Sequence, residues 1–172
     1  DELGLKKKKY MVMTLHRPSN VDEKQQLKTL ISQIVTLGKD YPIIFPVHPR
    51  TKKLLQDLDL KFDNLHYVEP LGYLEFNYLV KNTFAVLTDS GGITEETTVM
   101  NVPCITLREN TERPETCEIG TNILVGNDPK KITASFEKFL SGHWPQGQSP
   151  ELWDGKAAER IVEHLVHIYQ LD

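Results

Sequence analysis

The 172 residues contain only two cysteines, Cys104 and Cys117, and these form no Cys-x-x-Cys pair. Without such a pair the sequence offers neither a zinc signature nor a thioredoxin-like redox motif. A disulfide between the two stays open at this stage, although two ordinary thiols are the favoured interpretation. His164 and His167 share a helix face but have no acidic or cysteine companion at ligand spacing, so we expect no metal site there.

Long apolar runs and an excess of basic residues are missing as well. No stretch approaches the roughly 20 apolar residues that a membrane-spanning helix needs, and no signal-peptide pattern is present. The formal net charge is −4, so no general positive field would attract nucleic acid. We therefore expect a cytoplasmic protein that binds neither a membrane nor nucleic acid.

The first nine residues begin without a methionine and end in four consecutive lysines, 6–9. This composition is typical of a solvated linker rather than of a binding patch. We expect residues 1–9 to be a linker from a missing N-terminal domain, and the chain to be a fragment. Residues 10–172 are long enough to form one domain with a sizeable core.

Apolar runs and helical patterns alternate along the rest of the chain. Short apolar runs predict strands at 10–15, 42–47, 65–68, 84–88, 103–107 and 122–125. Helical spacing predicts helices that end near residues 37, 58, 81, 100, 140 and 169. Because the strands are continuous apolar runs, they indicate a parallel sheet covered on both faces. The expected fold class is α/β, a Rossmann-like doubly wound parallel sheet.

Capping residues predict where some of these helices begin. Asp22 can cap the helix that ends near residue 37, and Asp128 can cap the helix that starts at Pro129. Pro18, in the polar loop after the first strand, is expected to prevent a helix from starting there.

The most informative segment is the turn Ser90-Gly91-Gly92, between the strand at 84–88 and a helix. Backbone N–H groups at a helix N-terminus lack intrahelical partners and lie at the positive end of the helix dipole. Glycines let an anion approach these groups closely, so the turn is a candidate phosphate site. Glu96 lies four residues after Gly92 on the same helix face, where its carboxylate could bind ribose hydroxyls.

A simpler interpretation of the turn has about equal support from this segment alone. Ser90 could cap the helix, and the two glycines could merely make a turn. The segment matches neither the Gly-x-Gly-x-x-Gly dinucleotide fingerprint nor a P-loop. The choice between the two interpretations therefore depends on what other residues lie nearby.

Polar residues at the other strand exits favour the phosphate site. In a doubly wound sheet, ligands bind outside the carboxyl ends of the strands. The exits carry His16-Arg17, His48-Pro49-Arg50, Pro70-Leu71, Ser90-Gly91-Gly92 and Arg113. Their convergence on one edge of the sheet is a stronger signal than any single motif.

Two of these exit residues also have a purely structural interpretation. His16 could cap the end of a strand, although a place opposite a phosphate turn would suit proton or phosphate chemistry. Arg113 could be a surface ion-pair partner of Glu112 or Glu115, or it could grip a phosphate with two hydrogen bonds.

With these residues in view, the chain resembles the C-terminal half of the non-hydrolysing UDP-N-acetylglucosamine 2-epimerases over residues 10–169. The resemblance is carried by short segments along the chain. They are His16-Arg17, Pro46-Val47-His48-Pro49, Pro70-Leu71-Gly72-Tyr73, Asp89-Ser90-Gly91-Gly92 with Glu95-Glu96, Thr111-Glu112-Arg113-Pro114-Glu115, and residues 153–161. The combination of Asp-Ser-Gly-Gly with Thr-Glu-Arg-Pro-Glu is the most specific part.

The resemblance implies a two-domain fold of the glycosyltransferase-B type, of which this chain is the C-terminal, UDP-binding half. It implies that His16 faces the diphosphate and the sugar as the catalytic histidine of this half. It also implies binding residues for each part of UDP: Ser90, Gly91, Gly92 and Arg113 for the diphosphate, Glu96 for the ribose, and the backbone near Leu71 and Phe76 for the uracil.

The implied reaction interconverts UDP-N-acetylglucosamine and UDP-N-acetylmannosamine by eliminating UDP and adding it back, with the C2 proton returned to the other face. No metal or nicotinamide cofactor is implied. The carboxylates that move protons would belong to the N-terminal domain, so this chain alone should be inactive. By the same resemblance, the full enzyme would be a homodimer and would supply surface polysaccharides.

Two alternatives fit the same phosphate turn and ribose carboxylate. One is the donor-binding domain of a glycosyltransferase of this architecture, and the other is a UDP-sugar-binding module without catalysis. His16 and the Thr-Glu-Arg-Pro-Glu segment favour the epimerase. One departure from the family is the continuation Pro18-Ser19-Asn20, where many members have Arg-Glu-Asn, a stretch tied to a regulatory UDP-sugar site. Activation by a second substrate molecule is therefore in question for this chain.

Overall fold

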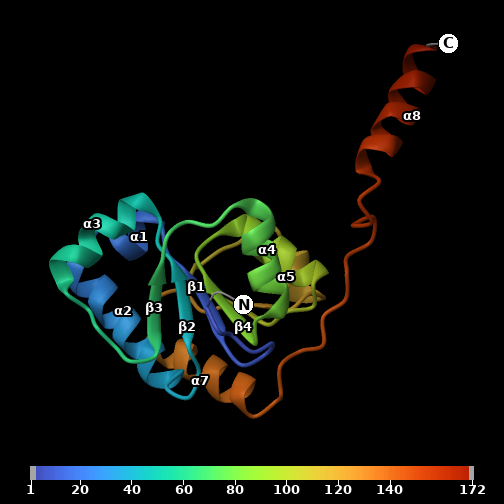
Figure 1. The fold of residues 1–172 in the computed structure, drawn as a ribbon. Helices are drawn as coiled ribbons and strands as arrows, with labels where there is room; N and C mark the ends of the chain where they lie inside the picture. The colour runs from blue at the N-terminus through green and yellow to red at the C-terminus, as the bar shows by residue number, and fades with distance from the viewer. Residues whose placement is uncertain (1–2, 171–172) are drawn as a thin grey trace.

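The computed structural model describes residues 3–170, apart from the side chain of Arg50. Its centre is a six-stranded parallel sheet with the strand order β3-β2-β1-β4-β5-β6 (Figure 1). The strands are β1 (Met11–Thr14), β2 (Ile43–Pro46), β3 (Leu65–Val68), β4 (Ala85–Thr88), β5 (Cys104–Thr106) and β6 (Asn122–Leu124). The predicted parallel sheet and the α/β fold class are confirmed.

Helices cover both faces of this sheet. The helices of the described chain are α1 (Pro18–Val21), α2 (Lys24–Leu37), α3 (Pro49–Leu58), α4 (Tyr73–Asn82), α5 (Gly91–Val99), α6 (Glu115–Glu118), α7 (Pro129–Leu140) and α8 (Ala157–Tyr169), of which α8 does not cover the sheet. A large apolar cluster joins α2, α3 and α7 to one face, and a smaller cluster joins α4 to the other. In β1, Met11 and Met13 belong to the first cluster and Val12 to the second, because successive side chains point to opposite faces.

The loop after β1 differs from the prediction in two places. Pro18 occupies the first position of α1, where its fixed φ suits a helix and its missing N–H has no intrahelical role. The restriction that proline imposes falls on the preceding residue, Arg17, which is extended with ψ at 138°. Asp22 consequently ends α1 as its C-cap, and Glu23 stands at the N-cap position of α2. Asp128, in contrast, caps α7 as predicted.

Residues 3–9 lie against the side of the fold that α4 covers. Leu5 packs on the smaller apolar cluster, and the N–H of Lys8 donates to the carbonyl of Asn82 at 2.8 Å. Lysines 6–9 are exposed, as predicted for a solvated run. Residues 1 and 2 of the predicted linker lie outside the described residues.

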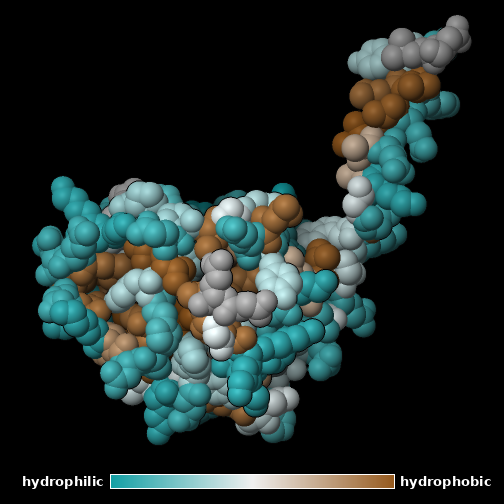
Figure 2. Space-filling model, viewed as in Figure 1, coloured by the Kyte–Doolittle hydropathy of each residue, from teal (hydrophilic) through white to brown (hydrophobic). Residues whose placement is uncertain are grey.

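Helix α8 stands away from the rest of the fold, at the end of the extended segment 141–156 (Figure 1). None of its residues is buried. Figure 2 shows an apolar stripe along it, which we call the α8 apolar face; its members are Ile161, Val162, Leu165, Val166, Ile168 and Tyr169. Within residues 3–170, neither α8 nor any other helix combines the length and apolar character needed to cross a bilayer.

The start of α8 is fixed by an ion pair between Arg160 and Asp154. The two guanidinium Nη atoms of Arg160 each lie 2.9 Å from a carboxylate oxygen of Asp154. The hydrogen bonds from Arg160, followed by the one from the backbone N–H of Lys156, lower the pKa of Asp154 to about 2. These side-chain contacts join the first turn of α8 to the segment directly before it.

Candidate active site at the β1 and β4 exits

The strand order places a topological switch point between β1 and β4. The chain proceeds from β1 outward through β2 to β3, and from β4 outward through β5 to β6. In doubly wound sheets the crevice outside the carboxyl ends of such a strand pair is the ligand site. Thr14 pairs in register with Thr88 at these ends, and their hydroxyl oxygens are 2.7 Å apart. His16 and the turn at Ser90 leave from the same two strand ends.

Asp89 is the residue that joins the two strand exits. Its side chain is fully buried, and one carboxylate oxygen, Oδ2, accepts hydrogen bonds from the backbone N–H groups of His16 at 3.0 Å and Arg17 at 2.9 Å. The same oxygen accepts from Nδ2 of Asn20 at 3.0 Å, and the ring Nδ1 of His16 lies 2.8 Å from Oδ1. Asp89 thus binds four donors of the β1 exit loop.

The balance of burial and hydrogen bonding keeps Asp89 ionised. Burial acts to raise the pKa of this carboxyl group, because a charge is poorly solvated inside the protein. The hydrogen bonds from the His16 ring, the Arg17 N–H and Asn20 act the other way and prevail, so the pKa of Asp89 lies below its ordinary value. The site therefore contains a fixed negative charge beneath the His16 ring.

This charge orients His16. Nδ1 of the ring is held by Asp89, so Nε2 is the nitrogen left to exchange a proton with a ligand. The His16 side chain is 40% exposed, and the ring of His48 lies 6.0 Å away between centroids. A carboxylate that fixes the tautomer of an imidazole is the arrangement found in acid–base catalysts. The geometry of His16 is the one that such a role requires.

In the turn after Asp89, the backbone N–H of Ser90 donates to Oγ1 of Thr88 at 3.0 Å, whereas the N–H groups of the first turn of α5 have no intrahelical acceptor. Ser90 stands at the N-cap position of α5 with extended backbone, but its hydroxyl makes no capping hydrogen bond. Ser90 is thus the N-cap residue of α5, as the simpler interpretation has it, but its side chain does not satisfy an N–H group of the helix. A Cβ built on Gly92 would meet no atom within 4 Å, so the space above the first turn of α5 is open. The first-turn N–H groups face this space without intrahelical acceptors.

Glu96 and Arg113 lie beside the same helix. The half-buried carboxylate of Glu96 makes no hydrogen bond or ion pair with any residue that the structure describes. Arg113 pairs through Nε with Glu95 of α5, rather than with the expected Glu112 or Glu115. The hydrogen bond that Arg113 donates to Glu95 is also the main reason why the pKa of Arg113 is raised. The Arg113 side chain is 55% exposed and is held along α5.

Leu71 and Phe76 lie near α4, next to the turn-bearing helix. Both side chains are partly buried and pack on the smaller apolar cluster, as does Ile93 of α5. The N–H of Phe76 donates to the carbonyl of Gly72 at 2.8 Å and so belongs to the first turn of α4. The backbone near Leu71 therefore lies at the entrance to α4, which Figure 1 shows beside α5.

Sequence reasoning gave no role to three residues that shape this site: Asp89, Asn20 and Arg108. Asp89 was named only as part of a motif. An acidic residue and a histidine close after two strand ends could have indicated that the two side chains pair. Asn20 is 1% exposed and also donates to the carbonyl of Leu107 at 3.1 Å, which ties the loop to the β5 exit. The local sequence could not predict this contact, because its two residues are 87 positions apart in the chain.

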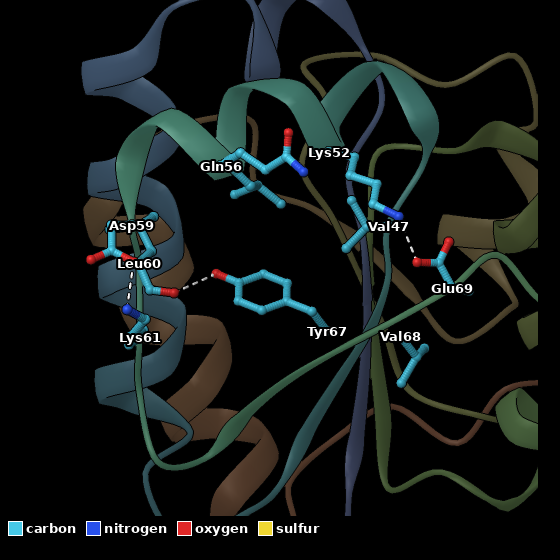
Figure 3. A pocket seen from close by; sticks show the side chains of 10 residues that line it. Val47, Lys52, Gln56, Asp59, Leu60, Lys61, Tyr67, Val68 and Glu69 are labelled. Atoms are coloured by element: carbon cyan, nitrogen blue, oxygen red, sulfur yellow. Dashed lines mark hydrogen bonds and ion pairs between the residues drawn. The ribbon is translucent and has the colours of Figure 1, made fainter.

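A separate hollow of about 390 Å³ lies beside the edge strand β3 (Figure 3). Its charged side chains neutralise each other: Lys52 pairs with Glu69 at 2.5 Å, and Lys61 with Asp59 at 2.7 Å. The Tyr67 hydroxyl donates to the carbonyl of Leu60 at 3.1 Å, and burial raises the pKa of Tyr67. This hollow offers less to a phosphate than the turn does.

Three further points concern metal binding, the two cysteines and the residues that follow β2. Within the described part of the chain, no group of three or more His, Cys, Asp or Glu side chains is arranged to hold a metal ion. Cys104 is buried, Cys117 is partly buried, and both are free thiols. The side chain of Arg50, one of the exit residues named above, lies outside the described residues.

Comparison with known proteins identifies the family to which this sequence is similar. Residues 1–166 match a family model described as UDP-N-acetylglucosamine 2-epimerase. A UDP-N-acetylglucosamine 2-epimerase from Methanococcus maripaludis is 49% identical over 166 residues, which cover 91% of this chain and 44% of that protein. The chain therefore spans less than half the length of this relative.

Solved structures show the same relationship. The crystal structure of Methanocaldococcus jannaschii UDP-GlcNAc 2-epimerase in complex with UDP-GlcNAc and UDP matches with a TM-score of 0.80 and 44% identity, over 93% of this chain and 46% of that one. An E. coli heptosyltransferase with ADP matches with a TM-score of 0.55 at 16% identity, over 79% of this chain and 44% of that one, and shares the fold alone. The expected glycosyltransferase-B type half-fold is confirmed.

Proposed function

The chain belongs to the UDP-N-acetylglucosamine 2-epimerase family, and from this premise we propose that it is the UDP-binding half of an enzyme that interconverts UDP-N-acetylglucosamine and UDP-N-acetylmannosamine. The observation that carries the proposal is the Asp89–His16 pair beside the open first turn of α5. An oriented imidazole next to an anion-binding turn suits a reaction in which a diphosphate leaves a sugar.

The chemistry explains why the reaction needs this arrangement. The proton on C2 of the sugar is not acidic in the intact substrate, so inversion without oxidation requires the C1–O bond to the diphosphate to break as that proton leaves. The departing diphosphate gains negative charge, which fixed N–H dipoles and cations stabilise. We assign this task to the amides of the Ser90-Gly91-Gly92 turn and to Arg113, and we assign to His16 a hydrogen bond or proton at the leaving oxygen.

The rest of the nucleotide would lie along α4 and α5. Glu96 has no protein partner among the described residues, and a carboxylate in that state suits a pair of ribose hydroxyls. We assign the uracil to the backbone near Leu71 and to Phe76, at the entrance to α4 next to α5. The residues named in these assignments lie on one side of the fold, outside the carboxyl ends of the strands.

We also propose that the partner of this chain is an N-terminal half, which supplies the carboxylates that move the C2 proton. The relatives are more than twice as long as this chain, and the α8 apolar face has no cover of its own. A helix that exposes six large apolar side chains on one side needs a partner surface. We assign that surface to the N-terminal half, and we propose that the complete enzyme is a homodimer.

The test is a chimera in which the N-terminal half of the Methanococcus maripaludis relative precedes this chain. In deuterium oxide, UDP-N-acetylglucosamine should give product that carries deuterium at C2. His16→Ala should lower the rate at least ~100-fold, the lower bound for loss of an acid–base group. Conversion without label at C2 would refute the elimination. UDP release only with an added acceptor would indicate a glycosyltransferase, and binding without any turnover would indicate a non-catalytic module.

A further inference from the structure

Arg108 is an arginine next to the phosphate turn for which the proposed function has no task. It follows β5, and its carbonyl accepts the N–H of Gly126 at 3.1 Å, so its backbone is held in the sheet edge. Only 9% of its side chain is exposed. A Cβ built on Gly91 would lie 3.1 Å from Nη1 of Arg108, which means that the guanidinium group packs directly on the backbone of the turn.

Without a bound anion, the position of the Arg108 guanidinium group next to the N-terminus of α5 is electrostatically unfavourable. Gly91 is the first residue of α5, and the N-terminus of a helix carries partial positive charge. A guanidinium group placed there repels the helix end, whereas an anion between them would be attracted to both. Burial of Arg108 strengthens the repulsion, because little water screens it.

Among the described residues, the hydrogen-bond partners of the Arg108 guanidinium group contact Nη2, on the side that faces away from the turn. Nη2 of Arg108 lies 3.1 Å from Oε1 of Glu112 and 3.4 Å from Oδ1 of Asn110. Nη1, the nitrogen that faces Gly91, makes no hydrogen bond with any residue that the structure describes. Glu112 is 76% exposed, and its pKa is lowered first by Arg108 and then also by Arg17 and Arg113. The carboxylate that pairs with Arg108 is thus a solvated one.

We propose that Arg108 binds the diphosphate through Nη1 and is the cation that holds the leaving group at the Gly91-Gly92 turn. Glu112 positions the guanidinium group through Nη2 and keeps Nη1 directed at the turn. Arg113, which is mostly exposed and paired with Glu95, is then a second and outer cation. This inference rests on the proposed UDP site, and it names the residue that gives that site its charge.

The test is calorimetric titration of the 172-residue chain with UDP and with uridine, which lacks the phosphates. Arg108→Met should weaken UDP binding roughly 10- to 100-fold, the range for hydrogen bonds to a charged group, and should leave uridine binding unchanged. Arg160→Met is the matched control, because it removes another ion-paired arginine, on α8 away from the turn. The control should bind UDP as the unaltered chain does.

Glu112→Gln provides an independent measurement in case Arg108→Met does not fold. It removes a negative charge near the diphosphate while leaving an oxygen for Nη2, so UDP affinity should rise a few-fold relative to uridine. Equal losses for UDP and uridine in Arg108→Met, no loss for either ligand, or a fall in UDP affinity in Glu112→Gln would each overturn the inference. If the unaltered chain binds no UDP at all, the proposed function itself fails, which is a distinct result.

Discussion

Replacing Asp89 by asparagine would keep the size of a buried side chain and remove its charge. Oδ2 of Asp89 now accepts from three N–H donors of the β1 exit loop, and Oδ1 accepts from the His16 ring. An asparagine has one amide oxygen, so its NH₂ group must face one of these two sides. It should face His16, because a ring nitrogen can change from donor to acceptor, whereas the backbone N–H of Arg17 cannot.

The loss in the free energy of unfolding follows from the hydrogen bonds that remain after the substitution. The backbone N–H groups of His16 and Arg17 and the amide of Asn20 would change from charged to neutral acceptors, at a cost of about 1 kcal/mol each. Relief from burying a charge offsets part of this cost. We therefore expect Asp89→Asn to lower the free energy of unfolding by about 2 kcal/mol at pH 7.

The pH dependence of this difference has a defined sign. Because the pKa of Asp89 is lowered in the folded protein, its contribution to stability is complete above the unfolded pKa of about 3.9. The contribution is lost as the pH falls from there through the lower, folded pKa. Urea unfolding curves of the two proteins should therefore differ at pH 7 and converge below about pH 4. Asp128→Asn is the matched control, since asparagine caps a helix as well as aspartate does.

A second readout reports on His16 directly. Nitrogen NMR of the imidazole should find the proton of the neutral ring on Nδ1 in the unaltered chain and on Nε2 in Asp89→Asn. The substitution should also reduce the turnover of the chimera, because Nε2, the nitrogen that faces the substrate, would then carry the proton of the neutral ring and could not accept one. An unchanged tautomer together with unchanged stability would refute the view that Asp89 organises this site.

Three further predictions concern binding and assembly. Arg113→Ala should weaken UDP binding by about 1.5–3 kcal/mol in calorimetry and leave uridine unaffected; equal losses for both would indicate a folding defect. Glu96→Ala should weaken UDP more than its analogue without ribose hydroxyls, whereas a solvent-facing role would leave both affinities unchanged. Leu165→Glu should leave the thermal unfolding temperature of this chain unchanged, because Leu165 is exposed, but should reduce copurification with the N-terminal half; unimpaired copurification would argue against docking through α8.

The sheet could be predicted because its signals are local. The strands were predicted as apolar runs followed by polar residues, and both ends of all six strands agree with the structure within one residue. The loop after β1 could not be predicted from Pro18 alone, because proline permits a helix that begins at its own position. The four-residue helix α6 was missed as well, since a single turn produces no periodic pattern.

The grouping of the strand-exit residues at one edge of the sheet could be predicted, and the contacts between their side chains could not. Residues at strand exits can be grouped on one edge from the fold class alone, which is why His16 and the Ser90 turn were placed together. Which side chains then bond to each other depends on tertiary geometry. The partner of Arg113 proved to be Glu95 rather than its sequence neighbours, and Arg108 gained its position through packing on Gly91.

The position of α8 at the end of the chain has a consequence for biosynthesis. Translation delivers the strands of the sheet before the helix that exposes the α8 apolar face. Domains generally fold as units in the order of their synthesis. If α8 docks on the proposed N-terminal half, that half and the sheet can each fold separately on the ribosome, and the two are joined once α8 emerges. The helix would then act as a late fastener between two domains that are already folded.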